Sequence, residues 1–340
     1  MTRFLLPALL LASVSLPPVA LAAPTARPDT AAGIALQGAD SFRLQIGDVE
    51  VIALSDGSVP QDLHVLLRDT TAAHTDALLD RGFLKNPVEA SINAFLFRTG
   101  SHVVLVDTGA GDFFGPGFGG KLLDSLSREG VSPDQITDVL LTHAHDDHMG
   151  GLVHGGKLNF PNATVHLGQP DLDFFLDRAN AARANYAMSY FDQAAAALQP
   201  EVDAGKIKTF SATTEVVPGV VAMLHPGHTP GSAFYRLTSR GQSLTFVGDI
   251  IHVAAVQAPD TGVTIAYDVD NAKAAAVRRQ AFSRFAAERT LIAIPHLSFP
   301  GIGHVQQVGS GFAWVPIPYT NRAPASDAAF ADPHKNGDKP

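Results

Sequence analysis

The stretch at residues 142–151, THAHDDHMGG, limits what this chain can be more than any other feature of the sequence. Five of its side chains, within six consecutive positions, carry imidazole or carboxylate groups that bind metal ions. An apolar run, Ile136 to Leu141, precedes it and two glycines end it, which predicts a strand, a tight loop and a helix, because glycine permits backbone angles that other residues cannot adopt cheaply. Packing the histidines as a core would leave buried polar rings without partners, at about 1–3 kcal/mol each. The stretch therefore predicts a metal site.

Three further candidate ligands share one property, because each follows an apolar strand directly or within a few residues. They are His228 in the loop HPGHTPG at 225–231, Asp249 after SLTFVG at 243–248, and His296 after LIAIP at 291–295. The order of hairpin, polar residue at a strand end and helix occurs in each half of the chain. This pattern predicts an α/β fold, an αββα sandwich of two mixed sheets with helices outside.

The pattern H-x-H-x-D-H followed by a later His, Asp and His resembles that of the metallo-β-lactamase superfamily. The resemblance covers nearly the whole chain that remains after removal of a predicted signal peptide at residues 1–23. A closer likeness is to the methyl parathion hydrolase group. It is carried by VDTGA at 106–110, GHTPG at 227–231, VAAVQ at 253–257 and HLSFPGIGH at 296–304. This resemblance implies an exported homodimer with two divalent metal ions per subunit.

The resemblance also assigns residues. It implies that one ion is bound by His143, His145 and His228, the second by Asp147, His148 and His296, and that Asp249 bridges them. Asp147 and Asp249 thereby become the predicted catalytic residues. Asp107 is expected to orient a ligating histidine or to hold its loop, and Asp146 to point outward. The remaining histidines considered are interpreted as structural: His154, His166, His225, His252 and His304.

The resemblance implies hydrolysis of neutral organophosphate triesters or aryl esters, and two metal ions would supply a bridging hydroxide for that reaction. The alternative is a lactonase or arylesterase with only incidental phosphotriesterase activity; a β-lactamase and a non-catalytic metal-binding protein are disfavoured. The chain has no cysteine. Nitrogen and oxygen ligands permit zinc, manganese, cobalt or iron, with zinc expected by default.

Aromatic side chains near the predicted site indicate a pocket for a small, neutral, hydrophobic substrate. Phe114 follows Asp107 in a loop rich in glycine and phenylalanine, and Phe175 and Tyr190 lie on a predicted helical region at 170–198. These three residues are the predicted pocket lining.

The first 23 residues predict a secretory signal, with Arg3, an apolar run and small residues at Ala20 and Ala22. Residues 24–40 are predicted to be a flexible segment, 41–322 the hydrolase domain and 323–340 a loose tail. The protein is therefore expected to be periplasmic or secreted, with no membrane association after cleavage. A formal charge of −9 disfavours nucleic acid as a partner.

Overall fold

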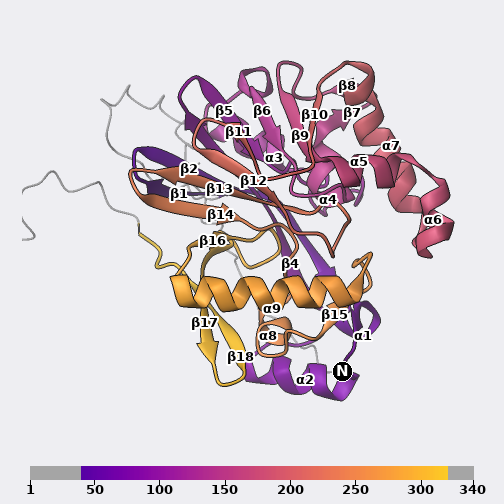
Figure 1. Ribbon diagram of the computed structural model, residues 1–340, viewed down its shortest axis with the longest axis vertical. Coiled ribbons are helices and arrows are strands. Elements are labelled where there is room, and N and C mark those ends of the chain that lie inside the picture. Colours follow the sequence, from indigo (N-terminus) through magenta and orange to yellow (C-terminus); the bar gives the residue numbers. More distant parts are fainter. Residues whose placement is uncertain (1–39, 321–340) are drawn as a thin grey trace, which may run out of the picture. The chain divides into compact units, whose positions relative to one another are not determined.

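Two seven-stranded sheets form the centre of the computed structural model, which describes residues 40–320 (Figure 1). Both sheets are mixed and helices lie on their outer faces, so the predicted αββα sandwich is confirmed. The predicted signal peptide at 1–23, the segment at 24–40 except Asp40, and the tail at 323–340 lie outside the described residues. None of the helices within 40–320 is long and apolar enough to cross a membrane.

The first sheet has the order β1-β2-β4-β5-β6-β9-β10. Its first four strands pair antiparallel, whereas β5, β6, β9 and β10 run parallel. The parallel strands end at the same edge, where the loop with the histidines begins. The bounds are β1 (Ser41–Ile46), β2 (Val49–Gln61), β4 (Val88–Thr99), β5 (His102–Val106), β6 (Asp138–Leu140), β9 (Thr164–Gly168) and β10 (Ile207–Phe210).

The second sheet has the order β11-β12-β13-β14-β16-β17-β18. All its neighbours pair antiparallel except β14 and β16, which are parallel. The parallel pair brings the residues after two distant strands to one edge. The bounds are β11 (Thr214–Val217), β12 (Val220–Leu224), β13 (Ala233–Ser239), β14 (Gln242–Phe246), β16 (Ile292–Ala293), β17 (Ile302–Val308) and β18 (Gly311–Pro316).

Alternation along β5 shows why the sheets stack. Val104 and Val106 face the core between the sheets, while Val103 and Leu105 face the core under the helices. This two-residue period is that of a strand covered on both faces. Phe246 of the second sheet packs between the sheets, its ring 5.2 Å from that of Phe95.

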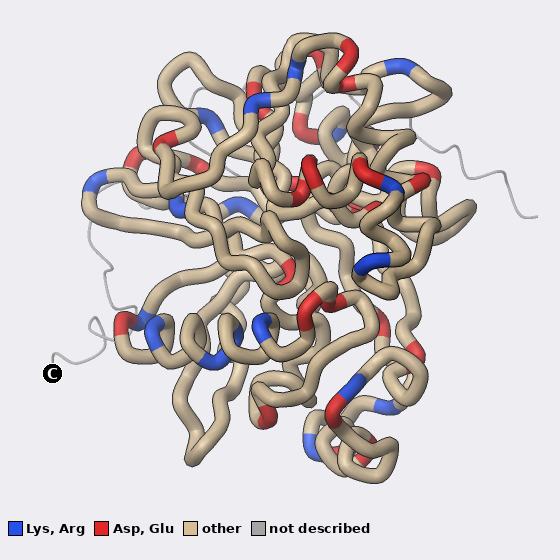
Figure 2. The backbone as a smooth tube through the Cα atoms, turned by 45° about the vertical axis from the view of Figure 1, so that its right-hand side comes forward, with Lys and Arg blue, Asp and Glu red and all other residues tan. Residues whose placement is uncertain are grey.

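The helices form the two outer layers. On the first sheet, α3, α5 and α7 pack against the core, and α9 packs against the second sheet (Figure 1). Lys and Arg positions are scattered among the elements, with a row along α9 (Figure 2). The helices are α1 (Leu63–Leu66), α2 (Ala72–Arg81), α3 (Leu122–Arg128), α4 (Asp146–Met149), α5 (Gln169–Leu176), α6 (Ala179–Ala184), α7 (Met188–Asp203), α8 (Ala254–Gln257) and α9 (Asn271–Glu288), with short 3-10 turns η1 (Pro133–Gln135) and η2 (Gly150–Leu152). Two small sheets pair β3 (Leu67–Arg68) with β15 (Thr264–Ile265) and β7 (Val153–His154) with β8 (Lys157–Leu158).

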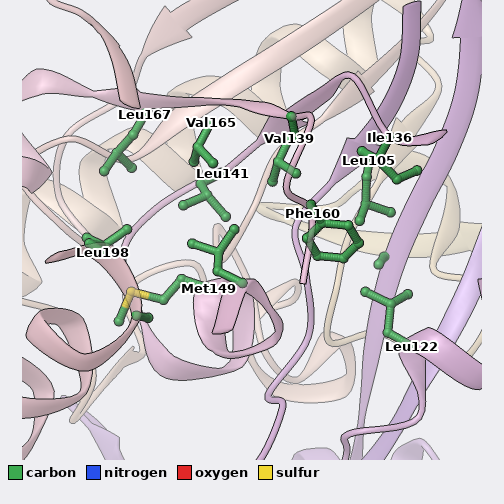
Figure 3. Close-up of a cluster of buried hydrophobic side chains, with 14 of the residues drawn as sticks. Leu105, Leu122, Ile136, Val139, Leu141, Met149, Phe160, Val165, Leu167 and Leu198 are labelled. Carbon is green, nitrogen blue, oxygen red and sulfur yellow. The ribbon is translucent and has the colours of Figure 1, made fainter. Parts of the chain in front are cut away.

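The predicted strand, tight loop and helix around the histidine stretch are β6, the loop at 141–145 and α4. Met149, directly after His148, is fully buried in a cluster with Leu141 and Leu198 and anchors this segment (Figure 3). Gly150 serves close packing rather than an unusual backbone angle, since its φ is −61°. A Cβ there would lie 2.2 Å from the carbonyl oxygen of Ala110. The expectation that the glycines supply special backbone angles is therefore wrong.

Candidate metal centre

The seven predicted ligands come from five chain segments that meet at one edge of the sandwich. The loop after β6 supplies His143 and His145, and α4 supplies Asp147 and His148. The other three, His228, Asp249 and His296, follow β12, β14 and β16. In each of the two predicted ligand groups, the potential ligand atoms lie within 4.8 Å of one another.

In the first group, three imidazole nitrogens converge. His145 Nδ1 lies 3.0 Å from His143 Nε2 and 3.0 Å from His228 Nε2. The carboxylate of Asp249 completes this group, with Oδ2 at 3.4 Å from His228 Nε2 and 3.7 Å from His143 Nε2.

In the second group, Asp147 faces two imidazoles, with His296 Nε2 at 3.3 Å and His148 Nε2 at 3.5 Å from its oxygens. Asp249 reaches this group as well, because its oxygens lie 3.0 Å from His296 Nε2 and 3.2 Å from His148 Nε2. One carboxylate thus touches both groups, which is the arrangement that a bridging ligand requires.

The hydrogen bonds on the outer side of the rings test whether these groups suit metal ions. Each of the five imidazoles has its other nitrogen within hydrogen-bond reach of an oxygen, so that nitrogen carries the proton and the inward nitrogen presents a lone pair. The partner oxygens are Thr142 Oγ1 for His143 (3.1 Å), Tyr186 Oη for His145 (2.9 Å), Asp107 Oδ2 for His148 (2.9 Å), Asp268 Oδ1 for His228 (2.8 Å) and Ser91 O for His296 (2.9 Å).

Inward lone pairs packed against carboxylates repel one another unless cations lie between them. His148 Nε2 and Asp249 Oδ1 are buried and have no hydrogen-bond partner, as expected of atoms that bind metal. Burial, together with the neighbouring imidazoles, lowers the pKa of His143 and of His145 well below the usual value, which keeps them neutral. Burial also opposes charge on His148 and His296, but the carboxylates of Asp249 and Asp147 raise the pKa of both, to about 9 for His296, so a proton and a cation compete for these two nitrogens. The residues therefore fit a dinuclear centre of divalent ions with nitrogen and oxygen ligands.

Two buried carboxylates orient the ligands. Asp107 accepts hydrogen bonds from His148 Nδ1 and, at 2.7 Å, from the backbone N–H of Thr142, so it both turns a ligand and holds the loop. Asp268, which was not predicted from the sequence, orients His228 through the hydrogen bond from His228 Nδ1. Burial raises the pKa of Asp268, but the hydrogen bond from His228 and the nearby charges of His228, Arg278 and His252 together outweigh it, so the net pKa is lowered. No local motif marks Asp268, because it lies in the turn after β15.

A cavity of about 310 Å³ opens beside the ligands, and its lining combines an apolar set of residues, the apolar wall, with a polar set, the polar wall. The apolar wall consists of Val59, Pro60, Phe114 and Phe118. The polar wall adds Gln61, Asp146, Tyr190, His252 and Tyr267 to the ligands His145, Asp147, Asp249 and His296. None of the described residues that line this cavity is Lys or Arg. A volume near 300 Å³ suits a small organic molecule.

Phe114 and Tyr190, predicted to line the pocket, do line this cavity, whereas Phe175 does not. Phe175 is 0% exposed and packs behind the metal centre, its ring 5.6 Å from that of His145 in an edge-on arrangement. The difference arises because α5 turns this side chain into the core under the first sheet, where it supports a ligand.

Two other residues differ from the expectations. Asp146 does not point outward but lines the cavity, where its Oδ2 accepts a hydrogen bond from Gln193 at 2.9 Å. Burial and the neighbouring Asp147 raise its pKa to about 7. His252 is more than a structural residue, since its Nε2 lies 3.1 Å from Asp249 Oδ2 and its ring stacks on His296 at 5.1 Å. In the sequence, only the position of His252 three residues after Asp249 indicated that it lies near the metal centre.

Tyr186 was also missed by the sequence analysis. Its hydroxyl donates to the carbonyl oxygen of Tyr267 at 2.7 Å, so its oxygen accepts from His145 Nε2. This tyrosine lies between α6 and α7 and connects that helical segment to the metal centre. Nothing in the sequence indicates that residue 186 reaches residue 145.

Comparison with known proteins places this geometry in a family. Residues 88–296 match the sequence profile of the Metallo-beta-lactamase superfamily. Hydrolase AbOPH of the beta lactamase superfamily is 35% identical, with 84% of this chain and 99% of that chain covered and a TM-score of 0.78. The chain therefore belongs to the metallo-beta-lactamase superfamily and is a metal-dependent hydrolase.

Other similar proteins are lactonases by name. AidC, a dizinc quorum-quenching lactonase solved in complex with the product N-hexanoyl-L-homoserine, is 28% identical. The match covers 83% of this chain and 98% of AidC, with a TM-score of 0.75. An N-acyl homoserine lactonase of Bacillus cereus is 26% identical over 164 residues, 43% of this chain and 58% of that protein. One from a Bacillus species is 28% identical over 111 residues, 33% of this chain. The chain spans 36% of the length of the latter, so these curated relatives match in part only.

Proposed function

We propose that this protein hydrolyses neutral carboxylic esters, with lactones as the preferred class, at a dinuclear zinc centre. The observation that carries the proposal is the division of the cavity lining beside the ligands into apolar and polar residues. A lactone with an apolar substituent matches that division, since its ester group is polar and its tail is not. The dizinc lactonase AidC and the named lactonases among the relatives support the choice.

Two divalent ions in this site would supply Lewis acidity and lower the pKa of bound water. The chain itself positions the substrate. Tyr190 and Tyr267 line the cavity, and burial raises the pKa of both hydroxyls, that of Tyr267 to about 12. Both hydroxyls therefore stay protonated at neutral pH and can donate hydrogen bonds to ester oxygens. The four residues of the apolar wall can bury an apolar substituent of the substrate.

Neutral organophosphate triesters and aryl esters, predicted from the likeness to methyl parathion hydrolase, remain the second candidate. Phe114 and Phe118 offer ring faces to an aryl leaving group. A phosphotriester, however, carries three organic ester arms around its polar phosphoryl oxygen, whereas a lactone carries a single tail for the one apolar set of lining residues. We therefore expect lactones to be better substrates than phosphotriesters.

The deciding experiment is a substrate panel with one zinc-loaded sample: a δ-lactone, N-acyl homoserine lactones, p-nitrophenyl acetate and methyl paraoxon. The expected order of kcat/KM places a lactone first, and chelated protein should turn over none of the four. If methyl paraoxon gives the highest kcat/KM, organophosphate hydrolysis replaces the proposal. Turnover of none by zinc-loaded protein rejects both.

Phe114→Ala tests the assignment of the apolar wall. Removing the ring takes away part of the roughly 1.5–3 kcal/mol that a buried Phe contributes, so kcat/KM should fall by about 5- to 30-fold. We expect the loss in KM, with both metal ions retained. The matched control is Phe83→Ala, because Phe83 is 98% exposed and is not part of the cavity lining. Unchanged KM for every substrate of the panel would remove Phe114 from the pocket.

A further inference from the structure

The apolar wall depends on one loop, residues 109–120, which connects β5 to α3. Phe114 and Phe118 on this loop line the cavity, although Phe118 is 43% exposed. Rings on a glycine-rich loop select a substrate only if the loop is held in place. The contacts that hold it therefore influence specificity.

Both ends of the loop are bound by one side chain. Asp56 lies at a bulge in β2, where the pairing with β4 shifts between Ser55 and Gly57. Its Oδ2 accepts hydrogen bonds from the N–H of Ala110 and of Gly120, both at 2.9 Å. Its Oδ1 accepts from the N–H of Leu122 at 2.8 Å. The start and the end of the loop thus share one carboxylate.

The glycines of the loop leave the space that this carboxylate needs. Gly109 and Gly119 both have φ of +72°, where side chains are strained. A Cβ on Gly109 would lie 2.3 Å from Asp56 Cγ, and one on Gly119 would lie 2.9 Å from Asp56 Oδ2. The same strand continues to Val59 and Pro60, which complete the apolar wall.

Asp56 is 0% exposed, and its three side-chain hydrogen bonds all come from backbone N–H groups. Burial raises the pKa of its carboxyl group, whereas these bonds oppose that change. An asparagine has one acceptor oxygen and one NH₂ group, so it cannot accept on both sides. In Asp56→Asn the NH₂ group would face either the N–H of Leu122 or the N–H groups of both Ala110 and Gly120, so at least one of these bonds is lost and the attachment of the loop is weakened.

We propose that Asp56 is a positioning residue that fixes the loop at 109–120 and thereby determines which apolar substituents the site accepts. The hydrogen bonds between Asp56 and the loop are part of the structure and do not depend on the identity of the substrate. The influence of Asp56 on the substrate rests on the proposed ester hydrolysis.

The loop is tested first without any substrate, by hydrogen exchange of Asp56→Asn measured by mass spectrometry. Peptides from 109–122 should exchange at least about tenfold faster than in the wild type, while the core strands keep their protection. The matched control is Asp138→Asn, because Asp138 is also buried but binds His102 and His166 away from the loop. Equal protection of 109–122 in Asp56→Asn and wild type overturns the proposal.

A second variant covers the case in which Asp56→Asn does not fold. Gly119→Ala leaves the carboxylate of Asp56 in place, but the added Cβ displaces the C-terminal end of the loop from it. Exchange in 109–122 should rise in the same direction, and unchanged exchange there overturns the proposal equally.

Kinetics then test the effect on specificity with lactones of increasing chain length. In Asp56→Asn, KM for the longest chain should rise about tenfold, while kcat, metal content and KM for the shortest chain stay within about twofold. Added to Phe114→Ala, the change should have little further effect, because both act on the same wall. Equal losses over the whole series, or fully additive losses, contradict the proposal. If the wild type hydrolyses no ester, the proposed function fails, and the exchange experiment still decides whether Asp56 holds the loop.

Discussion

Asp249→Ala is expected to lower kcat by about 10²–10⁴-fold and to reduce the metal content below two ions per chain. The reason is geometric, because the two oxygens of Asp249 lie 3.0–3.7 Å from imidazole nitrogens of both ligand groups. Asp249→Asn should be nearly as harmful, since a neutral amide does not supply the bridging charge. Metal analysis and kcat on one aryl ester and one lactone, measured on the same samples, test both variants.

Asp146→Asn is the matched control for this experiment. Asp146 lines the same cavity and lies three positions before Met149 on α4, but it belongs to neither predicted ligand group. It should keep both ions. If Asp249→Ala also keeps two ions and a near-normal kcat, the bridging assignment is wrong.

Removal of the metal ions should abolish activity and lower the thermal midpoint on the order of 10 °C. A ligand present at about 1,000 times its Kd stabilises the folded state by about 4 kcal/mol. Without cations, the buried atoms His148 Nε2 and Asp249 Oδ1 lie 3.2 Å apart and make no hydrogen bond, which adds to the loss. Calorimetry of dialysed, chelator-treated protein before and after addition of zinc measures the change.

The same measurement on Asp249→Ala provides the comparison. Because this variant is expected to bind less metal, chelation should lower its midpoint by a smaller amount. Equal midpoints of chelated and zinc-loaded wild type, or full activity in the chelator, would contradict a structural and catalytic metal centre.

The candidate ligands that the structure brings together could be predicted from the sequence because their positions are local or tied to strand ends. Four ligands lie within residues 143–148, and each of the other three follows an apolar run. The fold class follows from the same alternation of strands and helices. In contrast, the contacts of Asp268 and Tyr186 join residues 40 and 41 positions apart, and no spacing rule indicates such pairs.

The aromatic residues show where periodicity is insufficient. The predicted helical region at 170–198 consists of α5, α6 and most of α7, separated at Asp177 and at Asn185, whose φ is +50°. These breaks change which side of the segment faces the metal centre. Tyr190 therefore reaches the cavity, while Phe175 is buried behind His145.

Asp56 illustrates a further limit of the sequence. It follows Ser55 within an ordinary strand pattern, and only the bulge in β2 turns its carboxylate toward the loop at 109–120. The glycines of that loop were visible, but the side chain that requires them lies more than fifty positions earlier.

The central claim is a dinuclear centre that carries the activity, and a metal titration tests it most directly. Chelated protein is loaded with increasing zinc, and bound metal by elemental analysis and hydrolysis of the best panel substrate are measured on each sample. The expected result is saturation near two ions per chain, with activity rising until the second ion is bound. A bound ratio that stays below one after reconstitution, or full activity without metal, would contradict it.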